Sequence, residues 1–281
     1  MEPLKPSDYT DLIRTALAED TPGGDVTTQH LFEADARGSA TLIAKAPGII
    51  AGLPVFTEVF ATLDPDFLVE PHVSDGTRLS PGQPIARLTG LIRTLLTGER
   101  VALNILQRCS GIATAAAHYV DAVRGLPVTI LDTRKTAPGL RALDKYAVRT
   151  GGARNHRMTL SDLAMIKDNH LRLAGGITAA VHRLRTRCPG LRIEVETETL
   201  AEVREALDAG ADIIMLDNMP LDRMREAVTL IGGRCPVEAS GNVTLDTVRA
   251  IAETGVTFIS VGALTHSVKA LDISLKVDRP D

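Results

Sequence analysis

Six short apolar runs recur in the second half of the chain and constrain its fold most. The runs are Val128–Leu131, Leu163–Ile166, Leu191–Val195, Asp212–Leu216, Pro236–Ala239 and Thr257–Val261. Amphipathic segments of helical length, such as Leu200–Ala209 and Leu221–Leu230, separate most of them. Strands that are apolar on both faces and alternate with helices are typical of a parallel sheet covered by helices. The pattern therefore predicts a (β/α) barrel with fewer than the usual eight strands.

The segment before residue 97 has a different pattern and predicts a smaller, mixed α and β domain. Ser7 is placed to cap a helix whose apolar face carries Tyr9, Leu12, Ile13, Ala16 and Leu17. The expected elements that follow are a strand at Gly38–Ala46, a short helix at Pro54–Leu63 and a turn-rich hairpin region at 75–82. After residue 97, a long helix is expected at Glu99–Val123 and another helix at Gly139–Arg149.

Polar residues follow each of the six apolar runs. They are Asp132–Lys135, Lys167–His170, Glu196, Asp217–Asn218, Ser240–Asn242 and Gly262–Ala263. One charged residue after a strand is usually a solvated loop residue or a helix cap. Polar residues at six equivalent positions are better explained by a shared pocket, since a barrel gathers these strand ends on one rim.

The local charge also favours a pocket for an anionic ligand. Residues 134–167 carry eight Lys or Arg against two Asp, a net +6, although the whole chain carries −4. Arginine pairs bidentately with carboxylate and phosphate groups. Lys145 and Arg149 are expected to be ordinary surface residues. Aromatic residues are 3% with no Trp, which argues against a nucleic-acid reader that stacks bases.

The compartment is predicted from cysteines and hydropathy. Cys109, Cys188 and Cys235 show no spacing typical of a disulfide framework or a zinc site, which favours a reducing cytoplasm. No apolar run has the length of a membrane span, and the first ten residues lack the apolar region of a signal peptide. We therefore expect no association with a membrane.

Two later strand ends suggest binding of phosphate and of a metal or sugar. Ser240-Gly241-Asn242 and Val261-Gly262-Ala263 place small residues where backbone N–H groups can cradle a phosphate. Glycine after a strand is also ordinary turn chemistry. Carboxylates such as Glu196 and Asp217 beside a phosphate site commonly hold Mg²⁺ or sugar hydroxyls.

Several longer stretches together resemble one family, nicotinate-nucleotide pyrophosphorylase (carboxylating), also called quinolinate phosphoribosyltransferase. The matching stretches are Glu99–Thr114, Asp132–Arg141, Asn155–Arg157, Ile166–His170, Leu216–Met219 and Glu238–Gly241, with Glu19-Asp20 and Gly24–Thr27 near the start. The resemblance implies an α/β fold with an N-terminal α/β sandwich domain at residues 1–105, joined by residues 268–281. It also implies an incomplete barrel of about seven strands at residues 106–267.

The resemblance implies a pentosyl transfer in NAD biosynthesis. Quinolinate and 5-phosphoribosyl 1-diphosphate would give nicotinate mononucleotide, diphosphate and CO₂, with Mg²⁺ carried by the phosphoribosyl diphosphate and no protein ligand assigned to it directly. The implied catalytic residues are Lys135, Lys167, Glu196 and Asp217. The implied substrate-binding residues are these four with Arg100, Thr133, Arg134, His156, Arg157, Ser240, Gly241, Asn242, Val261, Gly262 and Ala263.

The family also implies a homodimer or a dimer-based hexamer in which Arg100 reaches the neighbouring active site. His156 and His170 are interpreted as positioning or structural residues rather than bases. The chain departs from the family pattern at Ala137, Ala153 and Asn242, where Thr, Gly and a second Gly are common. All three are small or loop-compatible changes, and none alters a charged position.

Three alternatives remain at this point. One is a paralogous phosphoribosyl-type enzyme of the same fold, associated in some genomes with molybdenum transport. Another is an aldolase-type barrel in which Lys167 forms a Schiff base. The third is a non-catalytic barrel that senses an anion and regulates a partner.

Overall fold

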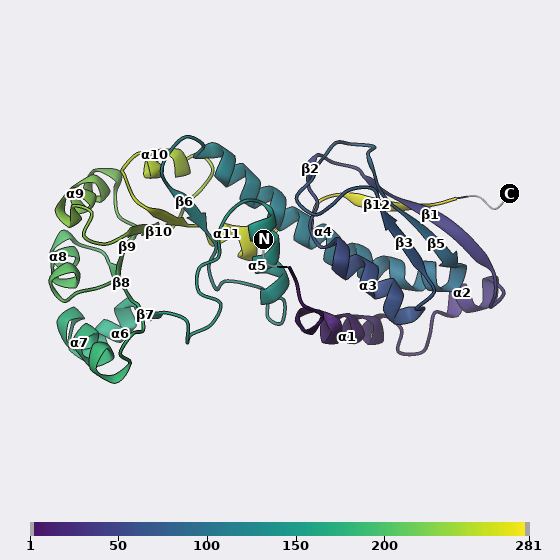
Figure 1. Cartoon of the computed structure of the whole chain (residues 1–281), viewed down its shortest axis with the longest axis horizontal. Coiled ribbons are helices and arrows are strands. Elements are labelled where there is room, and N and C mark those ends of the chain that lie inside the picture. The colour runs from purple at the N-terminus through teal and green to yellow at the C-terminus, as the bar shows by residue number, and fades with distance from the viewer. Residues whose placement is uncertain (1–2, 279–281) are drawn as a thin grey trace. The chain divides into compact units, whose positions relative to one another are not determined.

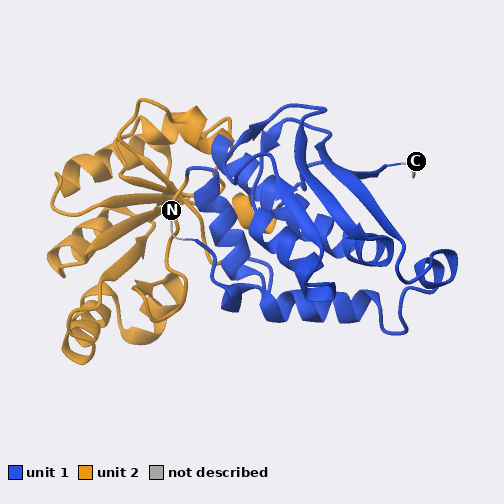
Figure 2. Ribbon diagram, turned by 45° about the vertical axis from the view of Figure 1, so that its right-hand side comes forward, with its two compact units in different colours: residues 1–117, 136–152, 267–281 blue, residues 118–135, 153–266 orange. Residues whose placement is uncertain are grey.

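A computed structural model describes residues 3–278. The chain separates into two compact units, shown in different colours in Figure 2. The first contains residues 1–117, 136–152 and 267–281, and the second contains residues 118–135 and 153–266. The domain boundaries expected from the family, 1–105 with 268–281 and 106–267, stay a prediction, and residues 279–281 lie outside the described part of the chain.

The first unit is built on an antiparallel sheet of four strands. Their order is β12 (Ile273–Val277), β1 (Arg37–Ala44), β5 (Pro84–Leu91) and β3 (Leu68–Pro71). The strand expected at Gly38–Ala46 is therefore confirmed. The turn-rich hairpin region expected at 75–82 is confirmed, since it connects the antiparallel strands β3 and β5. Within it, β4 (Arg78–Leu79) pairs with β2 (Gly48–Ile49), and the N–H of Gly82 donates to the Ala44 carbonyl at the end of β1.

The helices of the first unit are α1 (Thr10–Asp20), α2 (Val26–Leu31), α3 (Leu53–Leu63), α4 (Ile92–Ala122, which continues into the second unit) and α5 (Arg141–Thr150). The cap expected at Ser7 is wrong, because residues 6–8 form a 3₁₀ turn and Tyr9 is the N-cap of α1. The apolar face of α1 is confirmed at Tyr9, Ile13 and Leu17, which are buried. Helix α4 begins seven residues before the expected Glu99.

The position of Lys145 is a further correction in this unit. The sequence predicts it at the surface, but its side chain is fully buried, as are most residues of α5 around it. The neighbouring Asp144 is also fully buried and accepts two hydrogen bonds from Arg108, each 2.9 Å long. Helix α5 is thus enclosed on nearly every side, which an amphipathic pattern does not reveal.

The second unit contains a parallel sheet of six strands within the described residues. In spatial order they are β6 (Thr129–Leu131), β11 (Phe258–Ser260), β10 (Val237–Ser240), β9 (Ile213–Asp217), β8 (Ile193–Thr197) and β7 (Ala164–Ile166). A single bridge joins Leu131 to Arg154 beside β6. The six apolar runs are therefore confirmed as strands, and this bridge stands in place of a full seventh strand.

Helices follow the strands of this sheet along the chain. They are α6 (Asp168–Ala174), α7 (Ile177–Arg187), α8 (Leu200–Asp208), α9 (Leu221–Ile231), α10 (Val248–Ala252) and α11 (Ala263–His266). Figure 1 shows α7, α8 and α9 on the outer side of strands β8, β9 and β10. The alternation expected from the sequence is confirmed, and it leaves the carboxyl ends of the strands free to form a site. None of the helices in residues 3–278 is long and apolar enough to cross a membrane.

Candidate active site

A cavity of about 790 Å³ lies at the carboxyl ends of these strands, within the second unit. Its volume is in the range of pockets for small molecules. Thirteen of the expected substrate-binding residues line it: Thr133, Arg134, Lys135, His156, Arg157, Lys167, Glu196, Asp217, Ser240, Gly241, Asn242, Gly262 and Ala263. The structure thus brings together residues that are more than one hundred positions apart in the sequence.

Two expected residues do not line this cavity. Val261 is buried, and its N–H donates to the carbonyl of Leu131. Its expected role in binding stays a prediction. Arg100 is an exposed residue of α4 and belongs to the first unit. Its expected role in a neighbouring subunit stays a prediction.

Four of the basic residues that line the cavity are defined here as the cation side: Arg134, Lys135, His156 and Arg157. Lys167 is instead ion-paired with Glu196. Burial and the nearby charge of Arg134 lower the pKa of Arg157. The Nε of Arg134 is buried and has no acceptor within the described residues. Two adjacent guanidinium groups with an unused donor are costly unless an anion enters between or beside them. The cation side is therefore suited to a ligand with carboxylate or phosphate groups.

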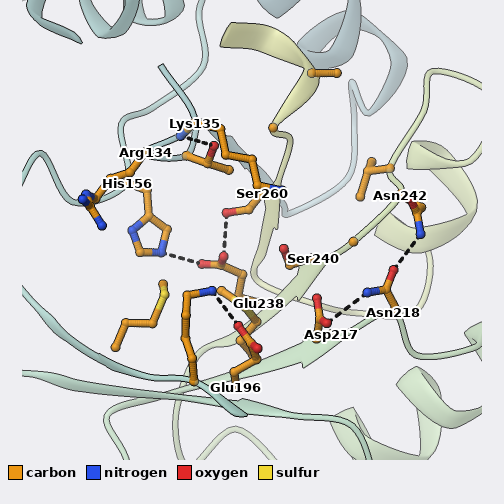
Figure 3. Close-up of a pocket in the computed structure, with 18 of the residues that line it drawn as sticks. Arg134, Lys135, His156, Glu196, Asp217, Asn218, Glu238, Ser240, Asn242 and Ser260 are labelled. Atoms are coloured by element: carbon orange, nitrogen blue, oxygen red, sulfur yellow. Dashed lines mark hydrogen bonds and ion pairs between the residues drawn. The ribbon is translucent and has the colours of Figure 1, made fainter. Parts of the chain in front are cut away.

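Two glutamates beneath His156 are the main residues of the site that were not predicted from the sequence. His156 Nε2 lies 3.1 Å from Glu194 Oε2 and 3.3 Å from Glu238 Oε2. Ser260 Oγ donates to the other oxygen of Glu238 (Figure 3). Both glutamates are buried, and each lies between two apolar residues of its strand. A glutamate inside an apolar run was the sequence signal that could have revealed these residues, because a buried carboxylate needs a polar partner.

The cluster of His156, Glu194 and Glu238 retains a proton. Burial lowers the pKa of His156, but hydrogen bonds to Glu194 and Glu238 outweigh this effect and raise the pKa to about 9. Burial also raises the pKa of Glu194, although the hydrogen bond from His156 opposes it. Both shifts have the same direction, so His156 and Glu194 bind protons more tightly than they would in water.

The same cluster is poorly suited to a metal ion, although its ligand atoms lie within 4.8 Å of one another. The N–H of Arg157 donates to Nδ1 of His156. Nε2 carries a hydrogen and faces the two glutamates, so neither ring nitrogen is free to bind a metal. The cluster instead fixes the ring at the base of the cation side.

The opposite side of the cavity, defined here as the carboxylate side, consists of Glu196, Asp217 and the loop 240–242. Glu196 Oε2 lies 2.8 Å from Lys167 Nζ, and Asp217 Oδ2 accepts a hydrogen bond of 2.9 Å from Asn218 (Figure 3). Two separate carboxylates suit Mg²⁺ that keeps water and substrate phosphates as its other ligands. The donor set therefore fits an ion that arrives with a phosphorylated substrate.

Asn218 lines the cavity as expected of a residue after a strand, although no role was assigned to it. The lining residues that were not predicted also include Met165, Met215, Val243, Thr244 and His266. Both methionines lie inside strands, Met165 in β7 and Met215 in β9, where an apolar residue gives no sequence signal for a cavity. His266 lies beside Gly262, where a Cβ atom would come within 3.0 Å of its ring. Glycine at that position is thus explained by close packing.

Comparisons with known proteins identify the family of the chain. The N-terminal and C-terminal domain profiles of quinolinate phosphoribosyl transferase match residues 25–110 and 112–276. The chain is 48% identical to a carboxylating nicotinate-nucleotide pyrophosphorylase, chloroplastic, of Oryza sativa subsp. japonica, covering 96% of this chain and 78% of that protein. It is also 48% identical to a probable enzyme of that name from Synechocystis sp., covering 94% and 90%.

A solved structure gives the same result for the fold. The crystal structure of NadC from Streptococcus pyogenes superposes with a TM-score of 0.96 at 42% identity, over 100% of both chains. The nicotinate-nucleotide pyrophosphorylase from Francisella tularensis superposes with a TM-score of 0.95 at 40% identity, over 98% of both chains. The profile matches extend across most of the sequence, and the relatives are similar over nearly all of it. This chain belongs to the quinolinate phosphoribosyl transferase family.

Proposed function

We propose that this chain joins quinolinate to 5-phosphoribosyl 1-diphosphate and releases nicotinate mononucleotide, diphosphate and CO₂, a step of NAD biosynthesis. The observation that carries the proposal is the division of one cavity into a cation side and a carboxylate side. The relatives named above carry the same activity in their names. Quinolinate is a dianion, whereas the ribose offers hydroxyl groups, so each side matches one reacting part.

The cation side binds and orients the pyridine ring. Arg134 and Arg157 present guanidinium groups that pair with carboxylates, and Lys135 adds a third charge. His156 is held by Glu194 and Glu238, so its orientation is fixed before the substrate enters. The ring nitrogen of quinolinate is then held toward the anomeric carbon, and orientation of this kind supplies a large part of a rate enhancement.

The carboxylate side stabilises the charge that develops on the ribose. As the bond from carbon 1 to diphosphate breaks, positive charge grows on the ribose ring, and the carboxylates of Glu196 and Asp217 oppose it. Lys167 is ion-paired with Glu196 and is placed to exchange this partner for an oxygen of the diphosphate. Bound Mg²⁺ would neutralise the leaving diphosphate. The loop 240–242 and Gly262 would hold the 5-phosphate through backbone N–H groups.

Loss of CO₂ then follows from the chemistry of the joined product. The quaternary ring nitrogen stabilises the electron pair that is left on the adjacent carbon, and a proton replaces the carboxylate there. The chain's contribution is to keep the second carboxylate bound and the ring in place. No side chain has to act as a base in this step.

The proposal also covers the oligomeric state of the chain and its cellular compartment. The chain works as a homodimer or as a hexamer built from dimers, and Arg100 completes the cation side of a neighbouring subunit. Its exposure on α4 and its charge support this role. The setting is cytoplasmic, a proposal supported by three cysteines that are not paired with each other.

The test is an assay of purified chain with quinolinate, phosphoribosyl diphosphate and Mg²⁺. We expect nicotinate mononucleotide and CO₂ in equal amounts. Binding of phosphoribosyl diphosphate without turnover would favour a sensing protein instead. Trapping of a carbonyl substrate on Lys167 by borohydride would favour an aldolase, and turnover with a different acceptor would favour a paralogue of the same fold.

A further inference from the structure

A row of side-chain amides connects two loops of the second unit to the carboxylate of Asp217. Asn218 Nδ2 donates to Asp217 Oδ2 over 2.9 Å, and Asn242 Nδ2 donates to Asn218 Oδ1 over 2.9 Å (Figure 3). Asp217 is the last residue of β9, whereas Asn242 follows β10. The loop after β10 is thereby linked to the carboxylate at the end of the neighbouring strand β9.

The direction of this row is fixed by chemistry. A carboxylate accepts hydrogen bonds and cannot donate, so Asn218 must turn its NH₂ group toward Asp217 and its oxygen toward Asn242. Asn242 must then donate. Turning either amide would place two acceptors or two donors against each other, and the row therefore has one arrangement.

The backbone is shaped around the same row. Asn218 and Asn242 have φ angles of +50° and +49°, and they are the two non-glycine residues with positive φ in residues 3–278. Asparagine tolerates this left-handed conformation better than most residues. Gly241 directly precedes Asn242, and a Cβ atom on Gly241 would lie 2.3 Å from Asn218 Oδ1. The closeness of loop 240–242 to Asn218 therefore depends on a glycine.

We propose that Asn218 and Asn242 are positioning residues that aim the carboxylate of Asp217 at the ribose hydroxyls. Because Asn242 lies on the loop proposed to hold the 5-phosphate, its contact with Asn218 couples phosphate binding to the orientation of Asp217. This inference rests on the proposed function. It adds that recognition of the ribose and of the phosphate are not independent.

Two substitutions separate the amide from the backbone at residue 242. Asn242→Gly removes the donor but keeps the left-handed conformation accessible, whereas Asn242→Asp keeps the shape and faces an acceptor with another acceptor. Both are expected to raise KM for phosphoribosyl diphosphate by about 5–10-fold, the value of one lost hydrogen bond. KM for quinolinate should stay within about twofold. A glycine variant with unchanged kinetics would mean that only the backbone matters and would overturn the proposal.

A double-mutant cycle distinguishes positioning from direct contact with the ligand. The readout is the dissociation constant of nicotinate mononucleotide, measured by titration calorimetry, with thermal melting to confirm that each variant is folded. Asn242→Gly should weaken binding in the native chain but cause no further loss in an Asp217→Ala background. An equal loss in both backgrounds would show that Asn242 contacts the ligand itself and would overturn the proposal. A native chain that neither binds the nucleotide nor turns over would instead refute the proposed function, and the inference with it.

Discussion

Asp132 and Asp217 both lie at the end of a strand in the same sheet, and both accept a hydrogen bond from an asparagine amide. Asp132 is fully buried, and it accepts from Asn155 Nδ2 over 2.6 Å and from the N–H of His156 over 2.8 Å. Asp217 is half-buried and lines the cavity. The first carboxylate thus holds the segment that carries the cation side, while the second faces the ligand.

This difference shows which contacts orient the side chains on each side of the cavity. The cation side rests on buried bonds, namely those of Asp132 and of the cluster formed by His156, Glu194 and Glu238. The carboxylate side is ordered by a row of amides in which both asparagines are exposed. We expect the cation side to be fixed before binding, whereas the carboxylate side depends more on the substrate.

Replacing quinolinate with nicotinate tests the cation side with the largest expected effect. Nicotinate lacks one carboxylate, so it makes fewer contacts with Arg134 and Arg157 and has no carboxylate to lose as CO₂. We expect almost no nicotinate mononucleotide under conditions in which quinolinate is converted, measured by chromatography of the nucleotide product. Comparable rates for the two acids would reverse the assignment of the acceptor.

Arg134→Ala is the next largest change. Loss of a charged pair in a closed pocket costs on the order of 2–5 kcal/mol, so quinolinate should bind at least about thirtyfold more weakly. Arg134→Lys is the matched control, because it keeps the charge but loses the two-pronged geometry, and it should be intermediate. Titration calorimetry measures both. Unchanged affinity in a folded Arg134→Ala variant would remove this residue from the cation side.

Mixing two inactive variants tests whether Arg100 serves a neighbouring subunit. Subunits with Arg100→Ala and subunits with Lys167→Ala should regain about a quarter of the native activity after exchange, since half of the dimers are hybrids and each hybrid has one intact site. The activity is compared before and after exchange, which is followed by native mass spectrometry. Verified exchange without recovery would place Arg100 outside a shared site.

The smallest expected effect is on the pH dependence of stability. Because the pKa of His156 is raised from 6.5 to about 9 in the folded chain, the folded state binds more protons than the unfolded chain between these values. The stability that this protonation gives the folded state is fully present below about pH 6.5 and is lost as the pH rises toward 9. The raised pKa of Glu194 acts in the same direction.

Glu238→Gln should reduce this decline, because it removes one of the two carboxylates that favour the proton. The melting temperature between pH 6.5 and 9 is the measurement. Glu226→Gln, at an exposed ion pair on α9, is the control and should leave the decline unchanged. An identical decline in the native chain and in Glu238→Gln would show that the cluster does not hold the proton.

Much of this site could be predicted because its charged residues directly follow the recurring apolar runs of the sequence. Arg134, Lys167 and Asp217 follow apolar runs, and a parallel sheet brings such ends together, so the sequence alone predicted the cavity that these residues line. Glu194 and Glu238 were missed because they lie inside the runs, where core residues are expected. The burial of each glutamate is explained only by the cluster that it forms with the other glutamate and His156.

Other features depended on contacts between distant segments. The burial of Lys145 depends on the segments that enclose α5, and β4 pairs with β2, a strand far from it in the sequence. Neither leaves a local signal in the sequence. The amide row is similar, since residues 218 and 242 meet only because β9 and β10 are neighbours in the sheet.

A crystal structure of this chain with bound quinolinate tests the two-sided cavity most directly. We predict that both carboxylates lie within hydrogen-bonding distance of the cation side, with Arg134 Nε or its terminal nitrogens among the donors and with Asp217 free to face the ribose. A ring bound against Glu196 and Asp217, with Arg134 and Arg157 left without an anionic partner, would contradict the account.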